Sequence, residues 1–243
     1  MSHSHRLQPV VGPLVVGLAL AVLSHPDVAK AIAGLLGDSV RRPLSAGRLI
    51  ELGAHHLVLA GTGLAIVGCL GVGLGILATR RGARGLRGGI DTAAALAQAV
   101  PPVVVVALAL PVLGFGGPPT LLALVAYGVM PTLRGTVGAI EAVSPEAREA
   151  GFAIGLTPRQ VLTQVELPLA GAGILDTLRI ALVLSIATAA VGALAGASTL
   201  GTPIVAGLQN QNLVTMLQGA GATAALAFLC DALMLAAAGL LRR

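Results

Sequence analysis

Residues 52–79 read LGAHHLVLAGTGLAIVGCLGVGLGILAT and contain no Asp, Glu, Lys or Arg. A helix of about 20 apolar residues is long enough to cross the hydrocarbon core of a bilayer, where charged side chains are costly. The stretch therefore predicts a transmembrane helix. Three other windows share this lack of charged residues: 7–24, 92–133 and 180–230.

Two of these windows, 92–133 and 180–230, are too long for a single span. Glycine, proline and polar residues interrupt both, and such residues mark turns between helices. The interruptions are Gly114, Gly116, Gly117, Pro118 and Pro119 in the first window, and Gly201, Pro203 and residues 209–212 in the second. Each window therefore predicts two helices. The expected fold class is all-α, a polytopic membrane protein with six transmembrane helices.

The composition excludes several other classes of protein. Hydrophobic residues make up 56% of the 243 residues, charged residues only 10%, and the mean hydropathy is +0.92. A soluble domain, a disordered chain or a coiled coil needs many more polar residues. The net charge of +5 does not indicate nucleic acid as a partner, because the basic residues lie between apolar runs rather than in one patch. The expected surroundings are the lipid bilayer.

Basic residues predict the orientation of the spans, because Lys and Arg are enriched in cytoplasmic loops. With a cytoplasmic N-terminus and a retained first helix, 11 of the 15 basic residues lie at the inner face. These are Arg6, Arg80, Arg81, Arg84, Arg87, Arg134, Arg148, Arg159, Arg179, Arg242 and Arg243. Lys30, Arg41, Arg42 and Arg48 lie outside. Both termini are therefore expected in the cytoplasm.

Residues 141–168 differ from the rest of the chain. The sequence EAVSPEAREAGFAIGLTPRQVLTQVELP contains four Glu and two Arg and lies on the expected cytoplasmic side. Ser144 is suited to cap a helix that opens with Pro145, and Glu146 favours the positive end of that helix. This helix is expected to stop at Gly155, because glycine readily adopts the positive φ found at helix ends.

The same arrangement follows a second time. Thr157 precedes Pro158, and Gln160 lies three residues after Thr157, the spacing of a capping box. The second helix is expected to end at Leu167-Pro168 and lead into the fifth span. Two short capped helices joined at a glycine would form a rigid cytoplasmic element that receives force from another protein.

The chain has no sign of catalytic chemistry. A phosphate-binding loop needs Gly-Lys-Ser/Thr, and the only lysine, Lys30, lies between two alanines. Cys69 and Cys230 lie in apolar runs, without the spacing of a metal site. We therefore expect a protein that is not an enzyme and has no cofactor or metal.

The segment resembles a known motif. Glu149-Ala150-Gly151, three residues, Gly155, nine residues and Val165-Glu166-Leu167-Pro168 is similar to the EAA loop in permease subunits of binding-protein-dependent ABC importers. Gly151 and Val165 replace the Ala and Ile of that motif. The resemblance implies a type I permease fold in a bacterial plasma membrane. It also implies two ATP-binding subunits, a second or homologous permease, and an extracytoplasmic substrate-binding protein as partners.

Other stretches resemble the osmoprotectant branch of that family, which moves glycine betaine, carnitine or choline. They are Gln98-Ala99-Val100-Pro101, Pro111 to Gly116, Met130 to Arg134, Leu194 to Gly201 and Gly207 to Asn212. Residues 1–48 are expected to hold the first span and an extracytoplasmic segment, and residues 49–241 the permease core. Two alternatives remain: the same architecture moving an amino acid or other small solute, and a secondary transporter or channel that works alone.

Some isolated residues allow two interpretations. Asp231 lies within the sixth span, where an acidic residue either lines the pathway or forms a packed, hydrogen-bonded carboxyl inside the bundle or at the subunit interface. Asp176 and Arg179 are spaced to pair on one helix face. Pairs such as Gly71/Gly75 indicate either close helix crossing or chance in a glycine-rich chain, and we expect chance for any single pair.

Two further observations concern aromatic and histidine residues. Tyr127, Phe115 and Phe228 are too few and too scattered for the aromatic cage that quaternary ammonium groups favour. That scarcity predicts that substrate is selected by a separate binding protein. His55 and His56 are expected to be solvated near the outer end of the second span.

Overall fold

The computed structural model describes residues 4–35, 42–80, 82 and 87–241, and within these ranges it contains helices and no strands. The predicted all-α fold class is confirmed. The α-helices are α1 (Ser4–Leu23), α2 (Pro26–Leu35), α3 (Ala46–Ala78), α4 (Arg87–Ala99), α5 (Pro102–Leu113), α6 (Gly117–Glu141), α7 (Pro145–Ala153), α8 (Pro158–Val161), α9 (Leu167–Val191), α10 (Gly201–Gln209) and α11 (Leu213–Leu241). A π-helical segment, η2 (Leu162–Glu166), joins α8 to α9, and a 3-10 turn, η3 (Gly192–Ala195), follows α9.

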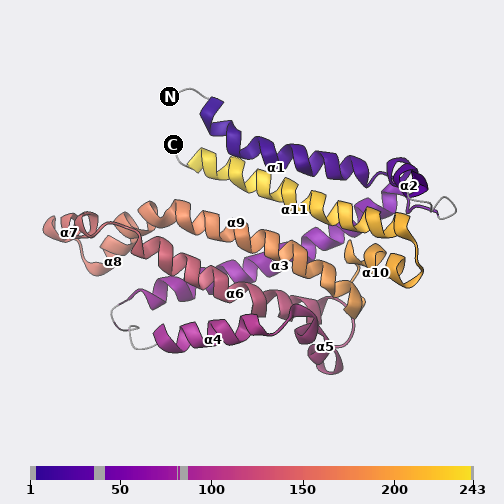
Figure 1. Cartoon of the computed structure of the whole chain (residues 1–243). Coiled ribbons are helices and arrows are strands. Elements are labelled where there is room, and N and C mark those ends of the chain that lie inside the picture. Colours follow the sequence, from indigo (N-terminus) through magenta and orange to yellow (C-terminus); the bar gives the residue numbers. More distant parts are fainter. Residues whose placement is uncertain (1–3, 36–41, 81, 83–86, 242–243) are drawn as a thin grey trace.

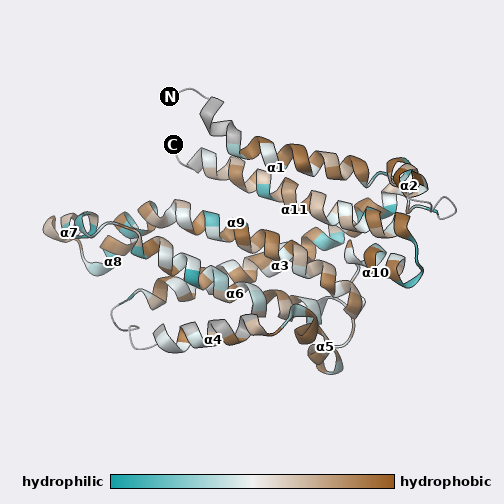
Figure 2. Ribbon diagram, viewed as in Figure 1, coloured by the Kyte–Doolittle hydropathy of each residue, from teal (hydrophilic) through white to brown (hydrophobic). Residues whose placement is uncertain are grey.

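The long helices run side by side, and the ends of the bundle differ. The start of α1, the end of α11 and the short helices α7 and α8 lie at one end, with α2 and α10 at the other (Figure 1). This arrangement agrees with the expectation that both termini share a side with segment 141–168. Apolar residues cover the long helices (Figure 2). Arg41, Arg81, Arg84, Arg242 and Arg243, used to predict the orientation, lie outside the described residues.

The number of full spans differs from the six expected. Among the described residues, four helical stretches are long and apolar enough to cross a membrane, and α1 with α2 is a fifth, bent candidate. The difference arises in the predicted third span, where the chain breaks at Val100-Pro101 between α4 and α5. Pro101 and Pro102 lack the N–H groups that would continue α4, and proline disfavours a helical conformation at the preceding residue.

The N-terminal segment packs onto the last helix. α1 runs along α11, and the chain then bends by 76° into α2. Ala29 and Ala33 of α2 are buried against Val214 of α11. The fully buried Gln218 accepts a hydrogen bond from the Leu44 N–H at 2.8 Å and donates one to the Leu44 carbonyl at 3.0 Å. Gln218 also donates to the Ser24 carbonyl at 3.4 Å, so residues on both sides of α2 are attached to the start of α11.

Helices α3 and α6 cross in close contact, and glycine allows it. A Cβ atom on Gly71 would lie 2.6 Å from Thr132 Cβ, and one on Gly75 would lie 2.6 Å from Thr136 Cβ. Both distances are shorter than van der Waals contact, so only glycine fits. The expectation that this pair arises by chance was wrong: it is the small-residue face of a helix crossing.

A single helical stretch, Pro158–Ala195, contains α8, η2 and α9. In a regular α-helix, Pro168 would lack a donor, and its ring would clash with the Gln164 carbonyl four residues earlier. The chain forms a π turn here instead, in which the Leu167 N–H bonds to the Leu162 carbonyl five residues earlier. The helix that was expected to end at Leu167-Pro168 therefore continues into the span.

Candidate coupling site

The site is the pair of short helices at the end of the bundle, α7 and α8, which we call the bracket (residues 144–166). Ser144 has extended backbone angles and its Oγ accepts a hydrogen bond from the Ala147 N–H at 3.3 Å. Pro145 and Glu146 occupy the first turn of α7. The cap predicted from the sequence is therefore present.

Gly155 forms the turn between the two helices. Its φ is +89°, a conformation that side chains with a Cβ rarely adopt. The Leu156 N–H bonds to the Gly151 carbonyl at 3.1 Å, and the Gly155 N–H bonds to the Phe152 carbonyl at 3.0 Å. These two bonds define a Schellman motif, which satisfies the last carbonyls of α7. The prediction of a glycine with positive φ at this position is confirmed.

The predicted capping box at the start of α8 is also present. The Thr157 Oγ1 accepts from the Gln160 N–H at 3.4 Å, and the Gln160 side chain accepts from the Thr157 N–H at 2.8 Å. Pro158 follows Thr157 at the first helical position. The caps of both helices of the bracket and the turn between them are thus formed by residues of the bracket itself.

The bracket has one buried contact and two exposed apolar side chains. Gly151 is buried, and a Cβ atom there would lie 3.3 Å from Val161 and 3.4 Å from Val165. The glycine that replaces alanine in the motif thus lies in the contact between α7 and α8–η2. Phe152 and Ile154 are 46% and 78% exposed and give α7 two large apolar side chains at its surface. The other predicted site residues are either exposed, namely Glu146, Glu149, Ala150, Gly155, Thr157, Pro158 and Pro168, or half-buried, namely Val165 and Leu167.

One residue of the site was not singled out in the sequence. Glu166 has a side chain that is only 10% exposed and lies between two arginines. Arg80 Nη2 donates to Glu166 Oε2 at 2.7 Å. Arg148 Nε lies 3.1 Å from Glu166 Oε1 as an ion pair, without the alignment of a hydrogen bond. A buried carboxylate needs such partners. The sequence feature that could have identified Glu166 as a site residue is that it is the acidic residue within Val165-Glu166-Leu167-Pro168.

A cavity of about 540 Å³ lies beside these charges, between the bracket and the end of α3. Arg80, Arg148 and Glu166 line it together with Thr79, Phe152, Pro158 and Val161. The described residues contain no cluster of His, Cys, Asp and Glu that would hold a metal ion. Charged side chains thus line a cavity at the end of the bundle where the bracket lies.

Comparison with known families identifies the family to which this chain belongs. The profile of the family described as “Binding-protein-dependent transport system inner membrane component” matches residues 71–243. The chain belongs to this family. It is a permease of an ABC importer.

Several curated permeases are similar over most of their length. The osmoprotectant import permease protein OsmY of Salmonella typhimurium is 34% identical over 76% of this chain and 79% of its own. The glycine betaine/carnitine/choline transport system permease protein OpuCD of Bacillus subtilis is 34% identical, over 77% and 82%. The choline transport system permease protein OpuBD of Bacillus subtilis is 36% identical, over 76% and 80%.

The fold also matches a solved transporter. A chain of the MetNI methionine ABC transporter, in an inward-facing conformation, superposes with a TM-score of 0.72 over 82% of this chain and 98% of that chain. The sequence identity is 20%, so the likeness concerns the fold. The type I permease fold expected from the motif is confirmed by this match.

Within the permease core, Asp231 is paired rather than isolated. Arg179 Nε of α9 contacts Asp231 Oδ1 of α11 at 2.6 Å, and Arg179 Nη1 lies 3.6 Å from Asp176. The predicted pairing of Asp176 with Arg179 is confirmed. The Asp231 side chain is 15% exposed, and the ion pair connects two helices of the permease.

His56 has a structural role at the opposite end of the permease. Its side chain is fully buried, so the expectation of a solvated residue was wrong. The Leu200 N–H donates to His56 Nδ1 at 3.2 Å, and His56 Nε2 lies 2.9 Å from the Ile186 carbonyl. Because Nδ1 accepts, Nε2 carries the hydrogen, and the ring is neutral. His56 thus connects α3, α9 and the start of α10.

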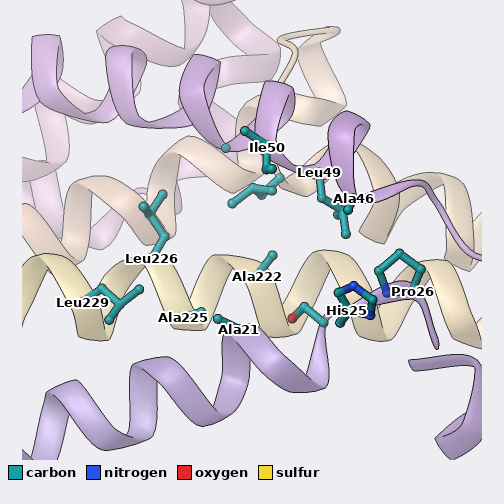
Figure 3. Close-up of a pocket in the computed structure, with 13 residues that line it drawn as sticks. Ala21, His25, Pro26, Ala46, Leu49, Ile50, Ala222, Ala225, Leu226 and Leu229 are labelled. Atoms are coloured by element: carbon teal, nitrogen blue, oxygen red, sulfur yellow. The ribbon is translucent and has the colours of Figure 1, made fainter. Parts of the chain in front are cut away.

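A second cavity of the permease lies near the same end and is almost entirely apolar. It has a volume of about 330 Å³ and lies among α1, α3 and α11 (Figure 3). Ala21, Leu49, Leu226 and Leu229 are among its lining residues. Its lining lacks the paired charges of the cavity beside the bracket, so it gives no reason to place the coupling site elsewhere.

Proposed function

We propose that this permease forms the substrate pathway of an ATP-driven importer in which two ATP-binding subunits dock on the brackets of two permease subunits. The second permease subunit is another copy of this chain or a homologous chain. The observation that carries the proposal is the capped bracket at the end of the bundle, with Phe152 and Ile154 exposed at its surface. Because α7 is not part of a helical stretch that is long and apolar enough to span a membrane, lipid does not account for its exposed apolar side chains, and they suit contact with another protein.

The bracket is also connected to the core in a way that suits force transfer. The helical stretch Pro158–Ala195 runs from the bracket through the bundle. A displacement of α8 would therefore move α9 as one body. Closure of the ATP-binding subunits would draw the brackets together and open the pathway on the other side, which is alternating access by rigid elements.

We infer that the bracket and both termini face the cytoplasm of a bacterial cell and that the chain lies in the inner membrane. The distribution of Lys and Arg in the sequence supports this orientation. The end with α2 and α10 then faces a substrate-binding protein. ATP hydrolysis belongs to the ATP-binding partner, because this chain has no phosphate-binding loop.

The proposed substrate is a quaternary-amine osmoprotectant such as glycine betaine, carnitine or choline. Support comes from the names of relatives that are 34–36% identical over three quarters of the chain. Aromatic residues are only 2% of the sequence. Because quaternary ammonium groups favour aromatic cages, affinity for the substrate would reside in the binding protein. The permease alone should bind glycine betaine no tighter than about 1 mM, or about −4 kcal/mol.

Substitutions at Gly155 test the role of the bracket. Valine is strained by about 1–3 kcal/mol at a positive φ, so Gly155→Val should tilt α8 and weaken docking of the ATP-binding subunit. Asn tolerates positive φ better, so Gly155→Asn is the matched control. Glu149 is exposed on α7, and Glu149→Ala removes a charge that the ATP-binding subunit could contact. This variant should therefore weaken coupling without changing the shape of the bracket. The measurements are co-purification of the ATP-binding subunit and transport, at equal membrane expression.

A contrary result would be clear. If Gly155→Val inserts normally, retains its ATP-binding subunit and transports like the parent, the bracket is not the coupling element.

A second substrate class is an amino acid or another small solute. The observation that favours it is the fold likeness to a methionine transporter, which is weaker support than the closer similarity to osmoprotectant permeases. Uptake measured with methionine beside glycine betaine, carnitine and choline distinguishes the two.

Another class of mechanism, a secondary transporter or channel, would need an intramembrane coupling site. Asp231, the candidate for such a site in the sequence, is paired with Arg179.

A further inference from the structure

Glu166 contacts two arginines from different parts of the fold. Arg80 follows the end of α3, and Arg148 belongs to α7. Both guanidinium groups reach the Glu166 carboxylate, at 2.7 Å and 3.1 Å, while its side chain is only 10% exposed. A carboxylate with so little access to water interacts more strongly with its partners than an exposed one does.

Each arginine is itself anchored to a backbone carbonyl. Arg80 Nε donates to the Ile76 carbonyl of α3 at 3.3 Å. Arg148 Nη2 donates to the Ile140 carbonyl of α6 at 2.6 Å. The two arginines therefore do more than neutralise Glu166: they connect the bracket to the ends of α3 and α6. We call Arg80, Glu166 and Arg148 the charge clamp.

The π turn accounts for the direction of Glu166. In a regular α-helix, residues five apart, such as Val161 and Glu166, are separated by about 140° around the axis. The π turn has more residues per turn and reduces this separation. Val161 and Glu166 both line the cavity beside the bracket. The turn that accommodates Pro168 thus also directs the carboxylate toward both arginines.

We propose that Glu166 is a positioning residue of the coupling site, which holds the bracket at a fixed angle to α3 and α6. The inference rests on the proposed function and extends it. The local caps fix the shape of the bracket, and the charge clamp fixes its orientation on the bundle. A displacement of α7 by the ATP-binding subunit then reaches α3 and α6 as well as α9.

Glu166→Gln tests this role, because it removes the charge and keeps the volume. In lipid nanodiscs, we expect the dissociation constant for the ATP-binding subunit to rise about tenfold. In proteoliposomes, we expect the ATP hydrolysed per substrate imported to rise several-fold. Glu166→Asp keeps the charge and should bring both the dissociation constant and the ATP hydrolysed per substrate part of the way back to the parental values. The matched control is Glu51→Gln, which removes a 2.7 Å ion pair with Arg48 at the other end of α3 and should change neither quantity.

A merely stabilising role predicts a different result. In that case Glu166→Gln lowers the melting temperature but leaves the dissociation constant and the ATP-to-substrate ratio unchanged, and the proposal is overturned. If Glu166→Gln fails to fold, Arg148→Gln provides the test, because it leaves the pair between Arg80 and Glu166 intact. Arg148→Gln should raise both quantities, and parental values would overturn the proposal.

The outcome can be separated from a failure of the proposed function. If Gly155→Val uncouples transport while the clamp variants do not, the bracket couples to the ATP-binding subunit without the clamp. If neither Gly155→Val nor Glu166→Gln changes coupling, the proposed function itself fails.

Discussion

Substituting Gly75 tests the packing that holds α3 against α6. A Cβ atom there would lie 2.6 Å from Thr136 Cβ and 2.9 Å from the Leu133 carbonyl oxygen. The carbonyl belongs to the backbone of α6 and cannot rotate away, so the helices must separate. Overpacking of this kind typically costs about 1–3 kcal/mol, and Gly75→Ala should lower the free energy of unfolding by an amount in this range relative to a matched control.

The matched control is Gly73→Ala on the same helix. Gly73 is exposed, and a Cβ atom there would have no neighbour within 4 Å. Both variants replace glycine by alanine in a helix interior, so their gain in helix propensity of about 1 kcal/mol is shared and cancels in the comparison. Unfolding in mixed micelles, followed by circular dichroism, measures the free energy of unfolding of both variants. Equal stability of the two variants would refute the close α3–α6 crossing.

The remaining predictions concern single contacts. His56→Leu leaves a buried backbone N–H without its acceptor and should destabilise the permease by about 1–3 kcal/mol, whereas His55→Leu, at an exposed neighbour, should be nearly neutral in the same unfolding assay. Asp231→Ala removes the ion pair with Arg179 and should cost about 1–2 kcal/mol, and unchanged stability would show that the pair contributes nothing. Gly151→Ala should equal or exceed the parent in stability with normal coupling, and loss of the ATP-binding subunit would contradict this.

Sequence reasoning succeeded where structure is determined locally. The caps at Ser144 and Thr157 and the positive φ of Gly155 depend on residues within about four positions, and all three were predicted. The same holds for the pairing of Asp176 with Arg179, which are one helical turn apart. Spacing alone is sufficient for such features, because the chain itself brings the groups together.

Features that depend on distant segments were missed. The partners of Glu166 include a residue 86 positions away, and those of His56 are 130 and 144 positions away. No local pattern indicates which segments will meet. The Gly71/Gly75 pair had the spacing of a crossing, but a glycine-rich sequence contains many such pairs, and the spacing does not say which of them faces a partner helix.

The break at Pro101 is a different case. The signal, two consecutive prolines, was present in the sequence. The third span was nevertheless predicted from the length of the charge-free window. That length reflects hydrophobicity and does not register the backbone N–H groups that proline lacks. The π turn before Pro168 is similar, because proline normally predicts a helix end, and here a wider turn lets the helix continue.

Uptake into proteoliposomes tests whether this permease imports its substrate at the expense of ATP. Vesicles hold this permease with its ATP-binding subunit, enclose ATP, and receive the binding protein and labelled glycine betaine or choline outside. We expect accumulation that requires all three proteins and internal ATP, and that is lost in Gly155→Val. Accumulation by the permease alone, driven by an ion gradient without ATP, would contradict it.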